Sequence, residues 1–175
     1  MDFEILVGAI TGPSGLPALQ NTGKNRFMGV EFENDYAVRP DTRVEIGYSY
    51  HDARFRDFVQ EFDGVPTQLA GHRLEMSPLH VLGAGLLYTP AQGLNANAVM
   101  SYVGPRYLTK RNIAPAGGYT TFSAGIGYRL GRNEIRVDGR NLNDVRPPVS
   151  ESELGDSQYY RLPARSLEVS YRMMW

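Results

Sequence analysis

The chain has 175 residues, with 18 basic and 19 acidic side chains, a formal net charge of −1 and no cysteine. This balance argues against a nucleic-acid partner, because no excess of Lys and Arg is present to neutralise phosphates. The absence of Cys excludes disulfides, thiolate metal sites and a cysteine nucleophile. The longest apolar stretch, Val81–Tyr88, is less than half of the ~18 residues that a spanning helix needs. A helical membrane protein is therefore excluded, whereas a membrane β-barrel is not, because alternation keeps its mean hydropathy low.

Aromatic residues and glycine are abundant, with 11 Tyr, 7 Phe, 1 Trp and 19 Gly, which favours β structure with many turns. Apolar and polar residues alternate along eight segments, so that each segment has one apolar and one polar or small face. The alternation is clear in 42–51, 94–103, 121–130 and 166–175, and weaker in 2–10, 26–36, 78–88 and 134–141. We predict eight strands and no helix.

Short and long connections alternate along the chain. Tight turns are predicted at 39–41, 89–93 and 131–133, and the long segments are 11–25, 52–77, 103–118 and 142–165. This order is typical of outer-membrane barrels, whose hairpins turn tightly on the periplasmic side and loosely outside. The fold class predicted is all-β, an antiparallel up-and-down transmembrane barrel of about eight strands. The last strand then ends on the periplasmic side, at Trp175.

The alternation alone does not say which face points outward. In a soluble lipocalin-like barrel the apolar face encloses a ligand, whereas in a membrane barrel it contacts lipid. We favour lipid because the chain ends on an apolar, aromatic strand and because tyrosines lie near strand ends, where an interfacial girdle belongs. These tyrosines are Tyr48, Tyr50, Tyr88, Tyr102 and Tyr128. Opposite charges on the polar face could pair across a lumen, although a soluble surface could carry them equally well. They are Glu31, Glu33, Arg43, Glu45, Arg129, Glu134, Arg136, Asp138, Arg140, Glu168 and Arg172.

Six short motifs occur in an order that resembles the C-terminal part of the barrel of TonB-dependent outer-membrane receptors. They are Gly23-Lys24-Asn25-Arg26-Phe27-Met28-Gly29-Val30-Glu31-Phe32-Glu33, Tyr48-Ser49-Tyr50-His51-Asp52-Ala53-Arg54-Phe55, Gly71-His72-Arg73-Leu74 with Ser77-Pro78-Leu79-His80, Ser101-Tyr102-Val103-Gly104-Pro105-Arg106-Tyr107, Asn141-Leu142-Asn143-Asp144 and Tyr160-Arg161-Leu162-Pro163-Ala164-Arg165. Each motif alone is weak, but six in order with alternating strands between them are specific. The resemblance covers about nine tenths of the chain, residues 23–175.

The resemblance implies a parent receptor that is not an enzyme and takes up a scarce solute, which we expect to be a ferric siderophore. It implies a bacterial outer-membrane location. Its implied partners are outer-membrane lipid, the barrel-insertion machinery, an energy-coupling inner-membrane complex and a small-molecule ligand. Family members also carry a plug domain, a signal peptide and a 22-stranded barrel. Because these parts do not fit into 175 residues, we expect residues 1–175 to be one barrel segment without plug or signal peptide. The alternative is a free-standing eight-stranded outer-membrane barrel with a structural or binding role.

Basic and aromatic loop residues are the candidates for contact with a substrate, because basic groups suit anionic iron chelates and rings suit planar ligands. These candidates are Arg106, Tyr107, Lys110, Arg111, Tyr159 and Tyr160, and the competing interpretation is plain loop packing. The resemblance further implies that the insertion machinery recognises the last strand through Val169, Tyr171, Met173 and Trp175.

Other motifs are better explained structurally. The Asn141–Asp144 segment could bind a cation, but Asn and Asp side chains commonly cap strand exits. His51, His72 and His80 lack the spacing of metal ligands, and the acidic segment 52–63 lacks a calcium-loop pattern. No Gly-x-Ser-x-Gly signature supports a hydrolase. We expect no cofactor and no metal.

Overall fold

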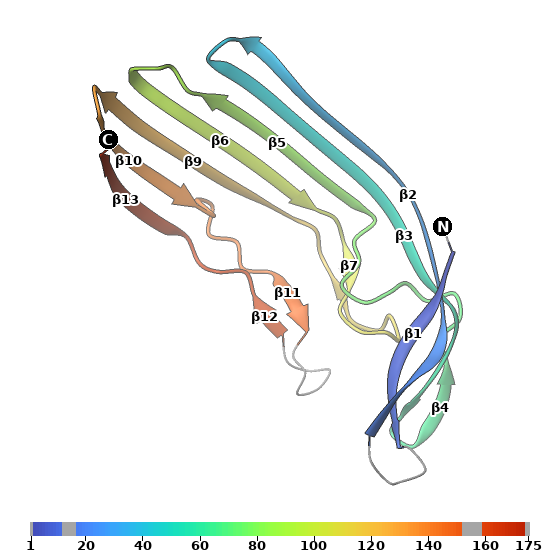
Figure 1. Ribbon diagram of the computed structural model, residues 1–175. Coiled ribbons are helices and arrows are strands. Elements are labelled where there is room, and N and C mark those ends of the chain that lie inside the picture. The colour runs from blue at the N-terminus through green and yellow to red at the C-terminus, as the bar shows by residue number, and fades with distance from the viewer. Residues whose placement is uncertain (1, 12–16, 152–158, 174–175) are drawn as a thin grey trace.

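The chain forms one curved antiparallel sheet, seen in Figure 1, with its strands in sequence order. The computed structural model describes residues 2–11, 17–151 and 159–173. The main path through the sheet has eight strands. They are β1 (Asp2–Thr11), β2 (Pro17–Arg39), β3 (Thr42–Phe62), β5 (His80–Tyr88), β6 (Gly93–Val103), β9 (Tyr119–Leu130), β10 (Asn133–Arg140) and β13 (Ser166–Met173). The predicted eight-stranded up-and-down arrangement is confirmed.

Five shorter strands lie in the long connections. They are β4 (Val65–Gln68), which pairs with β3, β7 (Arg106–Tyr107), which pairs with β8 (Pro115–Ala116), and β11 (Pro148–Glu151), which pairs with β12 (Tyr159–Arg161). All three pairs lie at the lower end of the sheet in Figure 1, opposite the short turns. The described part of the chain contains no helix that is long and apolar enough to cross a membrane.

The short turns lie where the sequence predicts them, but two of the long segments are more ordered than expected. The prediction of loops over 11–25 and 52–77 was wrong in part. β1 and β2 stay paired as far as Thr11 and Pro17, and β3 continues to Phe62 before it turns back into β4. Period-2 patterning reveals a strand only when one face is buried and the other is wet. In the outer parts of these hairpins apolar and polar residues do not alternate regularly. The period-2 pattern is therefore lost there, although the backbone pairing continues.

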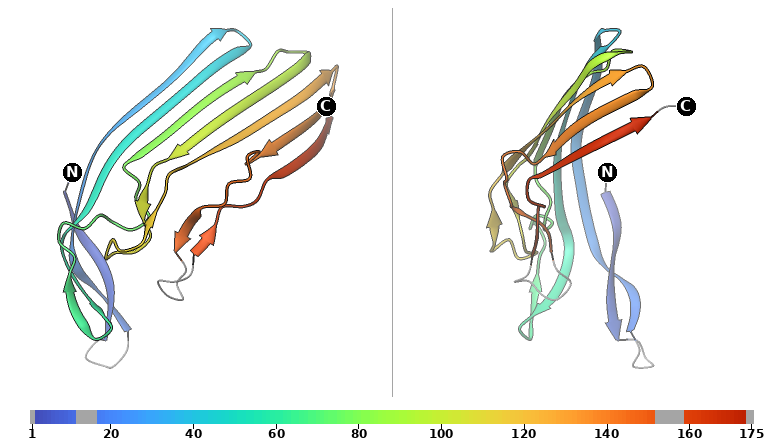
Figure 2. Two further views of the ribbon diagram at one scale, coloured as in Figure 1. Left: turned by 180° about the vertical axis from the view of Figure 1, so that it is seen from behind. Right: turned by 90° about the vertical axis from the view of Figure 1, so that its left-hand side faces the viewer.

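The sheet does not close on itself (Figure 2). Its two outermost strands are β1 and β13, and within the described residues neither pairs with the other. A closed eight-stranded barrel would pair them, because closure is what removes sheet edges. The structure therefore supports a segment of a larger barrel over the free-standing barrel.

Strand register places the apolar residues of neighbouring strands on one common face. Phe32 is opposite Tyr48, Tyr48 is opposite Leu82, and Ile135 is opposite both Tyr128 and Tyr171. We call this the apolar face, and large side chains on it remain exposed. They include Val30, Phe32, Tyr36, Ile46, Leu86, Leu94, Phe122, Ile126, Val137, Leu167 and Val169. A contiguous apolar surface of this extent needs an apolar partner.

Tyrosines border the apolar face at both ends of the strands. Tyr88 and Tyr128 lie next to the short turns, whereas Tyr50 and Tyr102 lie next to the long connections. Tyr48 donates or accepts a hydrogen bond with Nδ1 of His80 at 2.9 Å. Amphipathic rings at both borders of an apolar band match the interfacial girdles of membrane barrels.

Candidate ligand-facing surface

The opposite face of the sheet, which we call the polar face, carries a network of ion pairs across β6, β9 and β10. Arg129 Nη2 lies 3.1 Å from Glu134 Oε2, and Asn95 Nδ2 donates to Glu134 Oε1 at 3.0 Å. Arg136 Nε lies 2.8 Å from Asp138 Oδ2, while its Nη1 donates to Asn95 Oδ1 at 2.7 Å. Two of the opposite-charge pairs on this face therefore form locally, Arg129 with Glu134 between neighbouring strands and Arg136 with Asp138 along β10, and not across a lumen as predicted.

Two glycines of β9 make room for this network. A Cβ atom at Gly125 would lie 2.6 Å from Asn97 Oδ1 and would also collide with Arg136 and Asp138. A Cβ atom at Gly127 would lie 2.7 Å from Asn95 Oδ1. The side chains of β6 and β10 thus meet across the bare backbone of β9, and Arg136 also donates to Asn97. The sequence shows only small residues at these positions of β9 and does not indicate that side chains of β6 and β10 meet over them.

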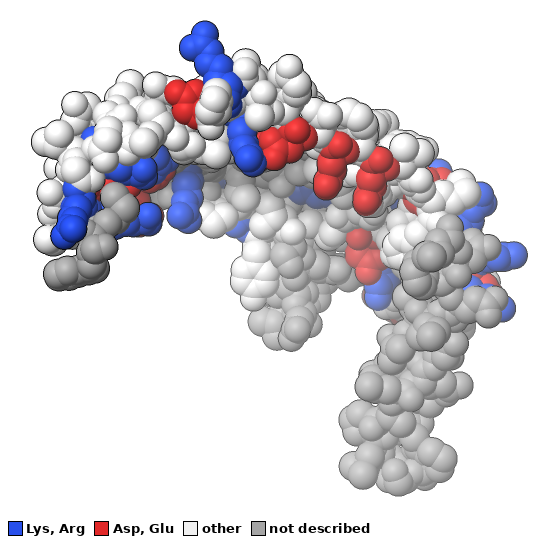
Figure 3. Space-filling model, turned by 45° about the horizontal axis from the view of Figure 1, so that its top comes forward, with Lys and Arg blue, Asp and Glu red and all other residues white. Residues whose placement is uncertain are grey.

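Acidic side chains gather on the polar face at β2 and β3, and a row of them is visible in Figure 3. Glu31, Glu33 and Asp35 follow one another on β2, and Glu45 is the register partner of Asp35. His51 Nε2 lies 3.0 Å from Glu31 Oε1, and Arg43 Nη1 lies 3.2 Å from Asp35 Oδ2. The polar face therefore carries mainly negative charge at β2 and β3.

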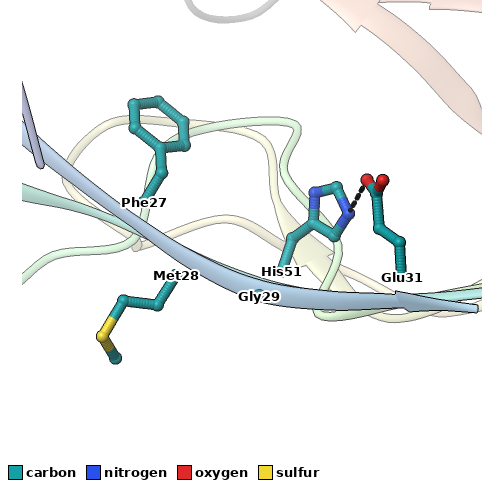
Figure 4. A pocket seen from close by; sticks show the side chains of 5 residues that line it. All are labelled: Phe27, Met28, Gly29, Glu31 and His51. Carbon is teal, nitrogen blue, oxygen red and sulfur yellow. Dashed lines mark ion pairs between the residues drawn. The ribbon is translucent and has the colours of Figure 1, made fainter. Parts of the chain in front are cut away.

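The pair of His51 and Glu31 borders an open hollow of about 370 Å³ that Phe27, Met28 and Gly29 also line. In Figure 4, Phe27, His51 and Glu31 point to one side of β2, whereas Met28 points to the other. The hollow thus offers an aromatic ring, an imidazole and a carboxylate at the end of the sheet nearest the long connections.

The hairpin of β3 and β4 has a small hydrophobic core of its own, which we call the outer hairpin core. It consists of Phe55, Phe58 and Leu69, with Phe62 and Leu74 packed against it. Phe55 is 2% exposed, and its ring stacks on that of Phe58 with centroids 5.1 Å apart. Sequence reasoning missed this core, although the several aromatic residues of the segment 52–77 were a signal for it.

The segment 104–118 packs against the chain that follows this hairpin, through the Asn112 side chain and one backbone hydrogen bond. Asn112 Oδ1 accepts from the Arg73 N–H at 2.8 Å, and its Nδ2 donates to the Arg73 carbonyl at 2.8 Å. Met76 N donates to the Tyr107 carbonyl at 2.7 Å. Two long connections thus form one packed unit, and Asn112 is a connecting residue that the sequence did not suggest.

Four of the predicted contact residues lie in this packed unit and have partners within the chain. Arg106 is 4% exposed, lies 5.2 Å from the centroid of the Tyr119 ring and donates to the Pro148 carbonyl. Lys110 Nζ donates to Gln60 at 3.2 Å. Arg111 lies 4.6 Å from the Phe62 ring centroid, and Arg73 lies 5.9 Å from that of Tyr107. Of these four residues Arg106 is the most deeply buried by loop packing, whereas Tyr107, Lys110 and Arg111 keep part of their surface exposed.

The other two predicted contact residues come from β12. Tyr160 is 64% exposed, and Tyr159 is half-buried. The bond from Arg106 to the Pro148 carbonyl joins the two long connections that carry the six candidates. The structure thus places the candidates on neighbouring outer connections, with Tyr160 as the most open of them.

The segment Asn141–Asp144 ties three strands together. Asn141 is buried, and its Nδ2 donates to the carbonyls of Val145 at 2.9 Å and Pro163 at 2.8 Å. Asn143 Nδ2 donates to the Thr120 carbonyl at 2.7 Å. These bonds connect the exit of β10 to β9 and to the segment before β13. The Val145 N–H also donates to Asn141 Oδ1 at 3.2 Å, which confirms the predicted capping role of Asn141. Among the described residues, no group of three or more His, Asp and Glu side chains is placed to hold a metal ion.

Asp144 is expected to make the segment 142–165 sensitive to acid. The Arg165 N–H donates to its Oδ1 at 2.9 Å and Arg146 pairs with it at 3.3 Å, which holds the pKa of Asp144 below its ordinary value. This stabilisation is complete above the unfolded pKa of about 4 and is lost as the pH falls through the lower folded value. We expect proteolysis of this segment to accelerate in that range, and Asp144→Asn to remove the pH dependence. An unchanged profile in the variant would contradict the assignment.

The apolar side chains of the last strand, β13, are exposed. Val169 is 73% exposed, and Tyr171 and Met173 share its face. Tyr171 donates to Asn133 Oδ1 at 2.6 Å, which fixes the ring beside the short turn. Trp175 lies outside the described residues. The predicted assembly residues that are described thus form an open apolar stripe at a sheet edge.

Comparison with known proteins agrees with this geometry. Residues 4–142 match the family model described as TonB dependent receptor-like, beta-barrel. The ferrioxamine receptor of Yersinia enterocolitica is 24% identical over 127 residues, which make up 70% of this chain and 17% of that receptor. The ferric yersiniabactin uptake receptor FyuA of Yersinia pestis has a TM-score of 0.73 at 23% identity, over 89% of this chain and 24% of its own. The siderophore receptor PiuA of Acinetobacter baumannii has a TM-score of 0.76 at 18% identity, over 89% and 22%.

The chain spans about a quarter or less of the length of each of these relatives. The solved structures share the fold, and the family model covers most of β1 to β10. Barrels of this family lie in the bacterial outer membrane, so the apolar face contacts lipid, the polar face lines the lumen and the long connections are extracellular. The chain belongs to the TonB-dependent receptor β-barrel family.

Proposed function

We propose that the chain forms part of the wall of a receptor that takes up a ferric siderophore across the outer membrane. The observation that carries the proposal is the curved, open sheet with an exposed apolar face and an ion-paired polar face. Only a barrel wider than eight strands leaves such a polar face clear of the opposite wall. The ferrioxamine receptor among the relatives supports a ferric siderophore as the solute.

The proposed receptor is a transporter that makes and breaks no covalent bond in its ligand. The ligand would bind at the outer connections, and an energy-coupling complex of the inner membrane would drive its passage through the lumen. Assembly would use the exposed stripe of Val169, Tyr171 and Met173, together with Trp175, as the signal for the barrel-insertion machinery. Exposed apolar side chains on an edge strand support that role, because they are accessible to a partner before the sheet is complete.

Substitutions in the outer connections should test ligand contact. We expect Lys110→Gln combined with Tyr160→Ala to weaken binding of an iron-loaded hydroxamate or catecholate siderophore about tenfold, since one charged and one aromatic contact are lost. Binding of radioactive ferric siderophore to outer membranes measures the effect. Val65→Ala, at the exposed tip of the β3–β4 hairpin, is the matched control. Equal binding by the double variant and the control would contradict the assignment of these residues, whereas no siderophore binding by any form of the protein would contradict the proposed function.

A further inference from the structure

Arg106 lies at the start of the segment 104–118, where this segment leaves the sheet. The segment departs from the point at which β6 and β9 are paired through Val103 and Tyr119. Arg106 is on β7, which Figure 1 shows beyond the end of β6, and its register partner is Ala116 on β8. The backbone of Arg106 is therefore held between two paired strands of the sheet and the short β7–β8 hairpin.

The side chain of Arg106 reaches a different connection. Its guanidinium lies 5.2 Å from the centroid of the Tyr119 ring, and its Nη2 donates to the Pro148 carbonyl. Pro148 is the first residue of β11 and the register partner of Arg161 on β12. Tyr160 precedes Arg161 on β12 and is 64% exposed. Arg106 thus ties the β11–β12 hairpin, which carries Tyr160, to the β7–β8 hairpin.

The foot of the β11–β12 hairpin is held by separate bonds. Asn141 Nδ2 donates to the carbonyls of Val145 and Pro163, which lie before β11 and after β12. These bonds close the foot but do not fix the direction in which the hairpin leaves the sheet. A two-stranded hairpin is only marginally stable by itself, so contact with a neighbour sets its direction. The bond from Arg106 to Pro148 is such a contact.

The guanidinium of Arg106 is buried without full compensation. The residue is 4% exposed, and its Nη1 has no hydrogen-bond partner. No carboxylate of the described residues forms an ion pair with it. Replacement of a buried charge by an apolar side chain of similar size is often neutral or stabilising, because desolvation of the charge is costly. Arg106→Met should therefore remove the bond to Pro148 without destabilising the barrel.

We propose that Arg106 is a positioning residue that holds Tyr160 in its ligand-binding orientation through the bond to Pro148. The sequence suggests direct contact of Arg106 with a ligand, but its side chain has almost no accessible surface. Without the bond, the β11–β12 hairpin would adopt several directions, and its ordering on binding would reduce the affinity for the ligand. This role rests on the proposed function, whereas the position of the hairpin can be measured without a ligand.

The first experiment measures the position of the hairpin in the full chain, inserted in lipid vesicles. The chain has no cysteine, so nitroxide labels on Ile126→Cys and Tyr160→Cys report a single distance between the sheet and the hairpin. Both positions are exposed, at 53% and 64%. We expect one narrow distance distribution with Arg106 present and a broad one in R106M. R106K keeps a donor but loses the planar fork over the Tyr119 ring, so its distribution should be intermediate.

The matched control is R73M. Arg73 also lies over a tyrosine ring, that of Tyr107, and donates to a backbone carbonyl, that of Ser77 at 3.1 Å. Neither contact involves the β11–β12 hairpin, so R73M should keep the narrow distribution. Equal distributions in R106M and R73M would overturn the proposal. Urea resistance verifies insertion, and R106M should equal the unaltered protein. If R106M failed to insert, a narrow distribution in R106Q would overturn the proposal in its place.

The second experiment measures binding of a hydroxamate and a catecholate siderophore, each loaded with radioactive iron, to outer membranes. We expect R106M to bind about threefold more weakly, close to the loss in Y160A, and R73M to bind as the unaltered protein does. R106K should restore part of the binding. Because Arg106 acts through Tyr160, R106M/Y160A should bind no more weakly than Y160A alone.

The outcomes separate the positioning role from the proposed function. Multiplication of the two single effects in R106M/Y160A would overturn the proposal, because it would assign Arg106 a contact of its own. Full binding by R106M would overturn it as well. Failure of every form, including the unaltered protein, to bind either siderophore would contradict the proposed function. The label distances would still show in that case whether Arg106 holds the hairpin.

Discussion

Ala98→Arg is expected to prevent stable insertion of the sheet, whereas Val99→Arg is expected to be tolerated. Ala98 lies on the apolar face, opposite Leu86 and Ala124, near the middle of the band between Tyr102 and Tyr88. A charged side chain on the lipid face at this depth costs about 2–4 kcal/mol. That cost is a large fraction of the stability of an ordinary domain.

The adjacent Val99 is a matched control because it has the same depth and strand but the opposite face. Its register partners are Gly85 and Ser123, whose small side chains leave room for a longer residue. Urea resistance of membranes containing each variant measures insertion. Equal loss in Ala98→Arg and Val99→Arg would contradict the assignment of the two faces, and so would a milder effect at position 98.

Removal of the Phe55 ring is expected to unfold the extracellular hairpin without removing the protein from the membrane. Phe55 stacks on Phe58, and Leu69 completes the outer hairpin core with no exposed surface. Truncation of a buried Phe to Ala costs about 3–5 kcal/mol, through lost burial and the cavity left behind. The hairpin has few other buried apolar residues, so Phe55→Ala should melt it locally.

Limited proteolysis of intact membranes would detect the melting as new cleavage between residues 56 and 76. The segment 104–118 should become sensitive as well, because Asn112 and Tyr107 hold it to the hairpin. Val59→Ala is the control, since Val59 lies on the same strand but is 52% exposed. Cleavage of Phe55→Ala at the same rate as Val59→Ala would show that the core does not hold the hairpin.

The eight strands and the two faces could be predicted from the sequence because the information is local. A residue such as Ile126 and its neighbour Gly127 alternate between lipid and lumen by the geometry of the extended chain alone. The capping role of Asn141 was also predictable, because a short amide side chain at a strand exit bonds nearby backbone. The order of short and long connections, which is also local information, predicted which end of the strands faces the periplasm.

The contact candidates show where local information ends. Arg106 and Lys110 have the same charge and lie in the same loop, yet one is buried on Tyr119 and the other reaches Gln60, fifty residues away. The extra length of β3 and the bridge of Arg136 over Gly125 likewise depend on partners that are distant in the sequence. No periodicity encodes these pairings.

The sequence by itself determined the eight strands, their alternating faces, the side of each connection and the resemblance to a receptor barrel. Only the tertiary structure decided that the sheet stays open between β1 and β13 and that the outer connections pack around Phe55. The physical reason is that alternation is a property of one strand, whereas closure, loop packing and charge clusters depend on register between strands. That register is fixed by which residues far apart in the sequence can bury their surfaces and satisfy their hydrogen bonds together.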